Sequence, residues 1–156
     1  MNGSDNGKPS KFDGGFYNAI TFYRISNFFK RKKIPFIPKV FEGLTHFLFS
    51  SVIPGSAKIG KGTFCSHRGM AVVIHKNSVI GEDCVIGTSV VLGGRNDTVP
   101  GGPVLGDRVY IGTGAKIIGP IKVGSDVKIG ANSVVLNDVP DGVTVVGIPG
   151  RILNEK

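Results

Sequence analysis

The sequence has 156 residues, a net charge of +8, 24 glycines and no tryptophan, which fits one domain with a small appendage and not a helical bundle. No apolar run approaches the roughly 20 residues of a membrane span. The N-terminus lacks the apolar core of a signal peptide, and two cysteines without a spacing framework indicate a reducing, cytoplasmic setting.

The N-terminal third differs in pattern from the rest of the chain. Residues 1–13 are polar and predict a mobile tail. Residues 14–51 predict a helical cap of two short helices, about 14–31 and 39–51, because apolar residues recur there at helical spacing. The two prolines of KIPFIPK are expected to break the helix between them. We expect the cap to cover the first coil of a repeat domain.

Most of the basic excess also lies in this third. Residues 1–50 hold eight Lys or Arg and three Asp or Glu, a balance of +5, against +3 in the remainder. A solvated helix end is one interpretation of this charge, and contact with an anionic membrane surface is another. No nucleic-acid recognition motif accompanies it.

From residue 53 on, an aliphatic residue recurs every six positions in three runs. Glycine follows eight of these twelve positions, and we expect it to permit a turn with positive φ. A short strand and a turn, repeated three times, close one triangular coil, and coils stack at about 4.8 Å. The pattern predicts an all-β fold, a parallel β-helix over residues 52–153. The aliphatic positions, expected to point inward, are Ile53, Ile59, Ile74, Ile80, Ile86, Leu92, Leu105, Ile111, Ile117, Val123, Ile129 and Val135.

The tandem hexapeptides VIGEDC, VIGTSV, VLGDRV, YIGTGA, KVGSDV and KIGANS resemble those of the hexapeptide-repeat acyltransferases. The resemblance implies a left-handed β-helix, a hand that general crossover rules do not predict. It also implies a homotrimer, with the pairing of trimers left open.

The six-residue period of aliphatic positions is interrupted twice. Fifteen residues separate Ile59 from Ile74, and thirteen separate Leu92 from Leu105. Insertions in a solenoid leave as outer loops, often on the functional face. The loops FCSHRGM and GGRNDTVPGGP are therefore expected to meet, either on the same side or across a trimer seam.

The stretch from KIGKGTFCSHRGMAVVIH to VVGIPGRIL is similar to the serine acetyltransferase branch of the family. The resemblance implies that His67 is the catalytic base. The family's partner Asp falls on Ser66, a second His and its preceding Arg fall on Gly102 and Gly101, and an entry-coil Asp falls on Val52.

These departures, the missing long helical N-terminal domain and the segments YRISNFF and CSHRG favour short relatives that acetylate sugars in surface-polysaccharide synthesis. The expected function is thus acetyl transfer from acetyl-CoA to a sugar hydroxyl. Serine O-acetylation, amino-sugar N-acetylation and a non-enzymatic β-helical scaffold stay open as alternatives.

A neutral imidazole can take the proton of an attacking hydroxyl, so His67 is the expected base and needs no covalent intermediate on Ser66 or Cys65. Backbone N–H groups at Gly93 and Gly94 are expected to stabilise the oxyanion. His75 stands where glycine is usual, and histidine tolerates positive φ better than most residues. Either a turn-filling or supporting role, or direct catalysis or substrate contact, suits it. The candidates for orienting His67 are Asp97 and Glu82.

The remaining site residues are expectations from the same resemblance, with repeat packing as the structural alternative for the small ones. Lys116 and Arg151 are expected to meet phosphates of the co-substrate. No metal is expected, because His46 lies outside the prism and catalytic zinc normally needs three protein ligands. The expected acceptor contacts are Ser66, Arg68, Arg95, Asn96 and Asp97, and the expected acetyl-CoA contacts are Gly93, Gly94, Thr113, Gly114, Ala115, Lys116, Ala131 and Arg151.

Overall fold

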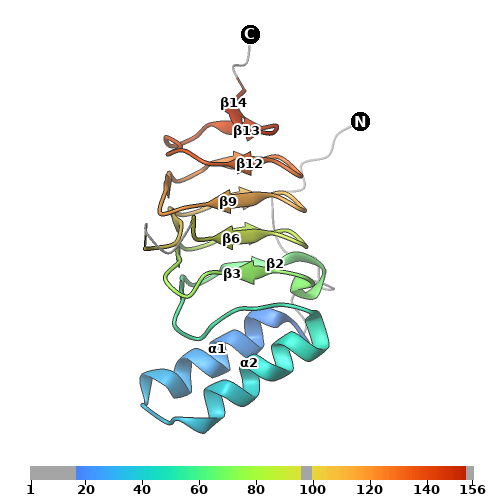
Figure 1. Cartoon of the computed structure of the whole chain (residues 1–156), viewed down its shortest axis with the longest axis vertical. Coiled ribbons are helices and arrows are strands. Elements are labelled where there is room, and N and C mark those ends of the chain that lie inside the picture. The colour runs from blue at the N-terminus through green and yellow to red at the C-terminus, as the bar shows by residue number, and fades with distance from the viewer. Residues whose placement is uncertain (1–16, 96–99, 154–156) are drawn as a thin grey trace.

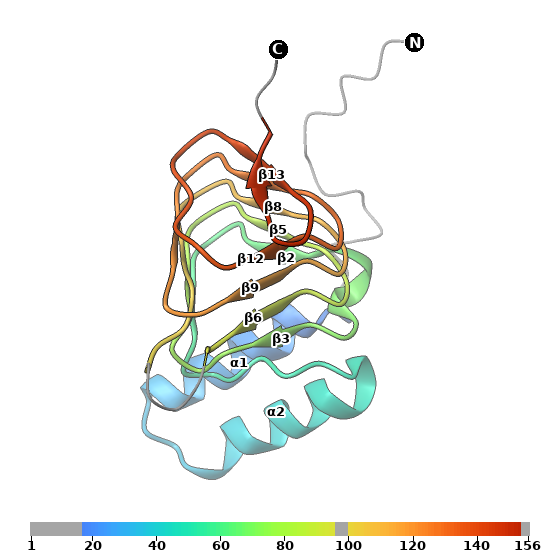
Figure 2. The same ribbon diagram turned by 45° about the horizontal axis from the view of Figure 1, so that its top comes forward.

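The structure, a computed structural model, describes residues 17–95 and 100–153. Two helices, α1 (Ala19–Arg31) and α2 (Phe36–Phe49), lie at one end of a prism of stacked coils (Figures 1 and 2). The expected mobile tail, 1–13, lies outside the described residues. Within them, no helix is long and apolar enough to cross a membrane.

The prism has three walls, each a sheet of strands contributed by successive coils. Wall 1 is β1 (Lys58–Ile59), β4 (Val79–Ile80), β7 (Val104–Leu105) and β10 (Lys122–Val123). Wall 2 is β2 (Phe64–Cys65), β5 (Val85–Ile86), β8 (Tyr110–Ile111), β11 (Lys128–Ile129), β13 (Thr144–Val146) and β14 (Arg151–Ile152). Wall 3 is β3 (Val73–Ile74), β6 (Val91–Gly93), β9 (Lys116–Ile118) and β12 (Val134–Val135). All pairings are parallel except that of β13 with β14.

The prediction of a parallel β-helix is confirmed. Equivalent positions of successive coils are in register, as in the column Ile59, Ile80, Leu105 and Val123. Eleven of the twelve aliphatic positions are buried, and Ile59, in the first coil, is partly buried. The core is therefore a stack of aliphatic layers, which each coil completes only against its neighbours.

The expected role of the glycines that follow the aliphatic positions was wrong. None of them has a positive φ, and the left-handed residues lie three positions after the aliphatic residue, as at Asp83 and Ser89. The glycines are needed for close stacking instead. A Cβ on Gly60 would lie 2.5 Å from the carbonyl carbon of Gly81 in the next coil, a separation that real Cβ contacts do not reach.

The helices begin and end differently from the predicted ranges. α1 begins at Ala19 instead of residue 14, with the side chain of Asn18 accepting from the amide of Ile20. α2 begins at Phe36 instead of residue 39, so the prolines of KIPFIPK do not keep the chain out of the helix. Pro35 is its N-cap and Pro38 lies in its first turn, where a backbone N–H has no helical partner to lose.

Packing fixes the helices on the first coil. The hydroxyl of Tyr23 in α1 donates to the carbonyl of Ala57 at 2.8 Å and accepts from the amide of Ile59. The ring of Phe22 in α1 packs edge-on against Phe49 of α2, with ring centroids 5.6 Å apart. α1 is thus bound to the prism, and α2 is bound mainly to α1.

Candidate active site

The two sequence loops lie on different edges of the prism. His67 lies between β2 and β3, on the edge where wall 2 meets wall 3, which we call the His67 edge. The second loop, between β6 and β7, lies on the edge where wall 3 meets wall 1, which we call the His75 edge. Wall 3 separates the described residues of the two loops, so these residues do not meet on one side of a single chain. Their meeting across a trimer seam stays a prediction.

His67 is held in an unusual turn. The 3-10 segment η1 (Ser66–Gly69) places His67 at φ 48°, ψ 45° and Arg68 at φ 65°, ψ 3°. Left-handed conformations of residues other than glycine cost roughly 1–3 kcal/mol each and cluster at functional sites. Two consecutive residues of this kind, one a histidine, mark this turn as a candidate site.

Side chains from outside the loop fix both ends of this turn. The side-chain Nδ2 of Asn18 donates to the carbonyl of Cys65 at 2.9 Å, and the hydroxyl of Ser51 donates to the carbonyl of Gly69 at 2.6 Å. Gly69, at φ 74°, leaves room for α1, since a Cβ there would lie 2.9 Å from the Cβ of Ala19. The helical cap therefore positions His67. Neither Asn18 nor Ser51 could be identified from the sequence, because neither belongs to a repeat or to a motif.

Cys65 and Cys84 are free and buried. Burial raises the pKa of the Cys65 thiol to about 12, so almost none of it is thiolate near neutral pH. Burial likewise raises the pKa of the Cys84 thiol. Cys84 packs in the interior, and Cys65 is not an activated nucleophile.

The structure places four of the eight expected acetyl-CoA positions on the same edge as His67. Thr113, Gly114 and Ala115 lie between β8 and β9, and Ala131 lies between β11 and β12, all on the His67 edge. These turns stack directly, with the amide of Asn132 donating to the carbonyl of Thr113 at 2.9 Å. They lie two and three coils above His67, roughly 10 to 15 Å at strand spacing.

Lys116 and Arg151, the two cations expected to meet the phosphates of acetyl-CoA, differ in their surroundings. Lys116 opens β9, and its ammonium donates to the carbonyl of Gly114 at 3.1 Å, beside the small residues of the edge. Arg151 opens β14 at the far end of wall 2 and is exposed.

His75 lies on the His75 edge, directly below the second loop. A Cβ on Gly94 would lie 3.6 Å from its Nε2, and a Cβ on Gly102 would lie 2.8 Å from its Nδ1. The Nδ1 accepts from the amide of Asn77 at 3.3 Å, so in the neutral ring the proton is on Nε2. His75 does not have a positive φ, so the backbone conformation expected for it was wrong. Its imidazole instead faces Gly94 and Gly102.

Ser78, next to His75, carries an unsatisfied hydroxyl. Its Oγ is buried and has no hydrogen-bond partner within residues 17–95 and 100–153. At the equivalent Thr63, the hydroxyl accepts from the amide of Cys84 in the next coil. The residue stacked on Ser78 is Pro103, which has no N–H to donate. The orphaned hydroxyl is thus a consequence of the proline that ends the second loop.

Other predicted acceptor contacts do not gather around His67 in one chain. Arg95 lies on the His75 edge, and its guanidinium donates to the carbonyl of Leu136 at 2.8 Å. Asn96 and Asp97 lie outside the described residues. Glu82 lies on the remaining edge, between β4 and β5, so it does not orient His67 of its own chain.

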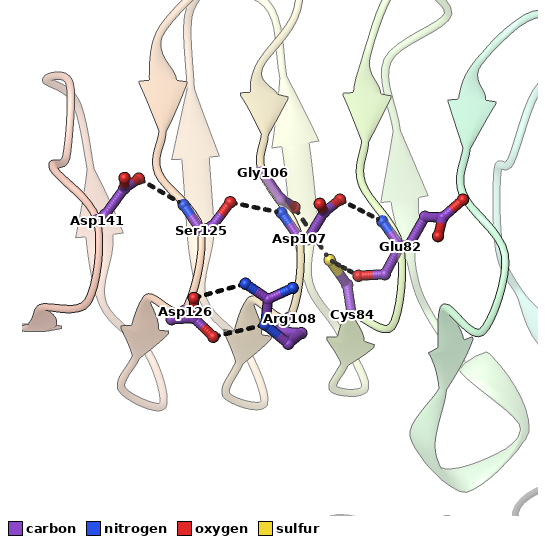
Figure 3. Close-up of polar contacts among 8 residues, drawn as sticks. All are labelled: Glu82, Cys84, Gly106, Asp107, Arg108, Ser125, Asp126 and Asp141. Carbon is purple, nitrogen blue, oxygen red and sulfur yellow. Dashed lines mark hydrogen bonds and ion pairs between the residues drawn. The ribbon is translucent and has the colours of Figure 1, made fainter.

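That remaining edge, between wall 1 and wall 2, is built for stacking (Figure 3). Asp107 accepts from the amide of Glu82 at 2.8 Å, and Ser125 accepts from the amide of Asp107 at 3.0 Å. Arg108 and Asp126 form an exposed ion pair at 2.7 Å, which lowers the pKa of the Asp126 carboxyl. These side chains satisfy turn amides of adjacent coils, so this edge has a structural role.

Comparison with known proteins places these features in context. A family model described as "Bacterial transferase hexapeptide (six repeats)" matches residues 102–137. A serine acetyltransferase of Helicobacter pylori is 41% identical over 139 residues, 88% of this chain and 81% of the relative. The solved structure of Neisseria gonorrhoeae serine acetyltransferase with serine superposes with a TM-score of 0.81 at 32% identity, covering 87% of this chain and 55% of that one. A serine acetyltransferase complex with CoA gives a TM-score of 0.78 at 38% identity, covering 86% and 55%.

The chain spans little more than half the length of several matched relatives, for example 56% of the serine acetyltransferase of Synechococcus elongatus. The expectation of a polysaccharide O-acetyltransferase was wrong, because the similar proteins are serine acetyltransferases. Sequence reasoning gave too much weight to the substitutions at residues 52, 101 and 102 and too little to the extended similarity around them.

Proposed function

Because the chain belongs to the serine acetyltransferase family of hexapeptide-repeat proteins, we propose that it transfers the acetyl group of acetyl-CoA to the hydroxyl of L-serine. The observation that carries this proposal is the fixed, left-handed turn of His67. It lies on the same edge as the expected co-substrate positions, in a chain 41% identical to a serine acetyltransferase over most of its length.

His67 is the general base in this reaction. As the hydroxyl oxygen of serine attacks the thioester carbonyl, the neutral imidazole takes the hydroxyl proton. The tetrahedral intermediate then collapses, the C–S bond breaks, and the CoA thiolate leaves and is protonated. The products are O-acetyl-L-serine and CoA. The high pKa of Cys65 favours this direct transfer over an acetyl-cysteine intermediate.

Acetyl-CoA lies along the His67 edge, with its acyl end toward His67. Thr113 and Ala131 present small, exposed side chains on this edge, whereas Ala115 is fully buried in the core and contributes repeat packing. Lys116 and Arg151 are the cations available to the phosphates of the co-substrate. The CoA complex of a similar serine acetyltransferase supports the same co-substrate here.

The working site is composite, and the protein is a trimer. His67 and the second loop lie on two edges that one chain holds apart. In a three-fold assembly with its axis parallel to the prism and wall 3 turned toward that axis, the His67 edge of one chain runs beside the His75 edge of its neighbour. His75 and the amides of Gly93 and Gly94 then face the reacting atoms from the partner's side.

The acceptor contacts follow from this arrangement. Arg68 directly follows the base and is exposed, so its guanidinium is available to the carboxylate of serine. The Nε2–H of a neighbouring His75 supplies a second donor. Glycine at 102 is compatible with this role, because a side chain there would meet the imidazole of His75. In this chain the imidazole therefore comes from position 75, next to wall 3, and not from position 102 in the loop, where the resemblance places the family's second histidine.

The test is thiol release from acetyl-CoA by the purified protein with L-serine as acceptor. Serine-dependent turnover should fall by about two to four orders of magnitude in His67→Ala, the usual contribution of a general base, with CoA binding retained. His46→Ala is the matched control, because His46 is an exposed histidine on α2. Turnover that survives in His67→Ala would assign the base elsewhere. Failure to bind acetyl-CoA at all would favour a non-enzymatic scaffold.

We place the protein in the cytoplasm, where acetyl-CoA and serine are available and where free thiols such as Cys65 and Cys84 persist. Contact with the inner face of the membrane rests on a separate feature, the exposed face of α2.

A further inference from the structure

α2 carries a continuous apolar stripe that nothing in the described chain covers. Phe36, Val40 and Phe47 are 79%, 58% and 84% exposed, and Leu44 and Leu48 complete the stripe. Their spacing places all five on one side of the helix. The opposite side is the packed one, with Pro38, Thr45 and Phe49 buried. This stripe is therefore surplus to the packing of α2 on α1.

Cations border the stripe at the start of α2. Residues 17–50 contain six Lys or Arg and a single acidic residue, a balance of +5. Lys30, Lys33 and Lys39 line one concavity of about 270 Å³ beside the first turn of α2. Glu42, which also lines it, accepts from the amide of Gly55 at 2.8 Å. The first turn has no side-chain cap, so its amides add a positive end to this concavity.

We propose that this face docks on a lipid bilayer that contains anionic phospholipids. The apolar stripe enters the boundary between headgroups and acyl chains, and the lysines beside the first turn of α2 meet headgroup phosphates. An amphipathic helix with a cationic border is the pattern of interfacial membrane helices. A second copy of the chain is a poorer occupant, because a face-to-face pair would bring two sets of lysines together, and Glu42, the one acidic residue in 17–50, already accepts from the amide of Gly55.

The position of α2 suits a flat partner. It is the outermost element at one end of the prism, with the C-terminal coils at the other end (Figure 1). In the trimer of the proposed function, on which this step rests, three such helices lie at the same end and face one plane. Three weak contacts then act together, which raises the apparent affinity for a surface. The seams between chains that carry the candidate active site run along the length of the prism, outside the face that α2 presents.

The experiment is co-sedimentation of the full chain with vesicles of pure phosphatidylcholine and of phosphatidylcholine with 30% phosphatidylglycerol, a fraction chosen as roughly that of an anionic leaflet. The wild type should bind the anionic vesicles and lose binding as salt rises. Phe36→Ser/Phe47→Ser should lower the partition coefficient at least about tenfold, as the loss of two buried aromatic contacts implies. Lys33→Glu/Lys39→Glu should lower it by a similar factor on anionic vesicles only.

Two control variants change the same chemistry elsewhere. Lys122→Glu/Lys128→Glu makes the same charge change on walls 1 and 2, more than a Debye length from the bilayer, and should alter binding less than about twofold. Ile148→Ser/Leu153→Ser removes two exposed apolar side chains near the far end of the prism and should also bind like the wild type. All variants should keep serine-dependent thiol release in solution, which separates failure of the docking from failure of the proposed function.

Three outcomes would overturn the proposal. One is a wild type that does not bind the anionic vesicles. Another is binding that Phe36→Ser/Phe47→Ser leaves unchanged, since net charge alone would then explain it. The third is a wild type that does not bind vesicles and whose mass in solution is twice that of Phe36→Ser/Phe47→Ser. That result would make the stripe an interface between copies of the chain.

Discussion

Gly102 and His75 should be energetically coupled, because one leaves the space that the other occupies. A Cβ on Gly102 would lie 2.8 Å from Nδ1 of His75, 2.9 Å from Oγ of Ser78 and 3.1 Å from the backbone nitrogen of Ser78. The backbone of Gly102 is outside the left-handed region, so an alanine there meets only a steric cost. We expect Gly102→Ala to lower the free energy of unfolding by about 1–3 kcal/mol, the usual cost of overpacking.

His75→Ala removes the nearest of these contacts. In that background Gly102→Ala should cost less, by a coupling energy of about 0.5–2 kcal/mol, but not zero, because Ser78 stays in place. Urea unfolding followed by circular dichroism at one fixed protein concentration measures all four proteins. Gly43→Ala is the control, since a Cβ there has no neighbour within 4 Å. Equal costs of Gly102→Ala in both backgrounds would refute the contact with His75.

Three further predictions follow from the coil stacking and from burial. Ser78→Ala should not lower the free energy of unfolding, since the hydroxyl it removes has no partner in the described part of the chain. Thr63→Val should lower the free energy of unfolding by about 1–3 kcal/mol, because it leaves the buried amide of Cys84 unpaired. Equal effects of the two substitutions in urea unfolding would contradict this. Gly87→Ala should lower the free energy of unfolding by more than about 1 kcal/mol, because its Cβ would lie 2.6 Å from an amide nitrogen of the next coil, and a wild-type urea midpoint would contradict the close stacking. Burial raises the pKa of both thiols, to about 12 for Cys65, so neither cysteine should react quickly with a disulfide reagent at pH 8 until denaturant is added; one fast thiol in the native protein would contradict their burial.

The repeat was readable from sequence because its physics is local. Each aliphatic position needs only the same position one coil away, so a fixed period predicts both the layer and the burial. The glycines were misinterpreted because glycine has two uses, positive φ and close approach, and composition does not separate them. The 2.5 Å between a Cβ on Gly60 and the carbonyl carbon of Gly81 shows that this glycine is needed for close approach of the coils. Likewise, Pro38 was taken for a helix breaker because sequence does not fix where the first turn lies.

The site was harder to predict because it depends on contacts between coils and between chains. His67 was found from its motif. Asn18 and Ser51, whose side chains hold its turn, lie outside the repeat, so the pattern did not identify them. The placement of the two loops on different edges could have been predicted by counting strands along the sequence. One follows a strand of wall 2 and the other a strand of wall 3, so they fall on different edges. The prediction that they meet then requires a second chain.

A composite site makes a quantitative prediction for mixed trimers. His67→Ala and His75→Ala are each expected to be nearly inactive as pure trimers. When the two variants are refolded together in equal amounts, a seam is intact only if one chain supplies His67 and its neighbour supplies His75. Random assembly makes about one seam in four intact, so serine-dependent turnover should recover to about a quarter of the wild-type value.

The double variant His67→Ala/His75→Ala mixed equally with wild type provides the control. If each site spans two chains, only seams between two wild-type chains work, and turnover should again be about a quarter of the wild-type value. If each site lies within one chain, this mixture should keep about half, and the two single variants should not complement each other. Absent complementation together with half activity in the control would therefore refute the shared site, and His75 would have to act, if at all, within the chain that carries it.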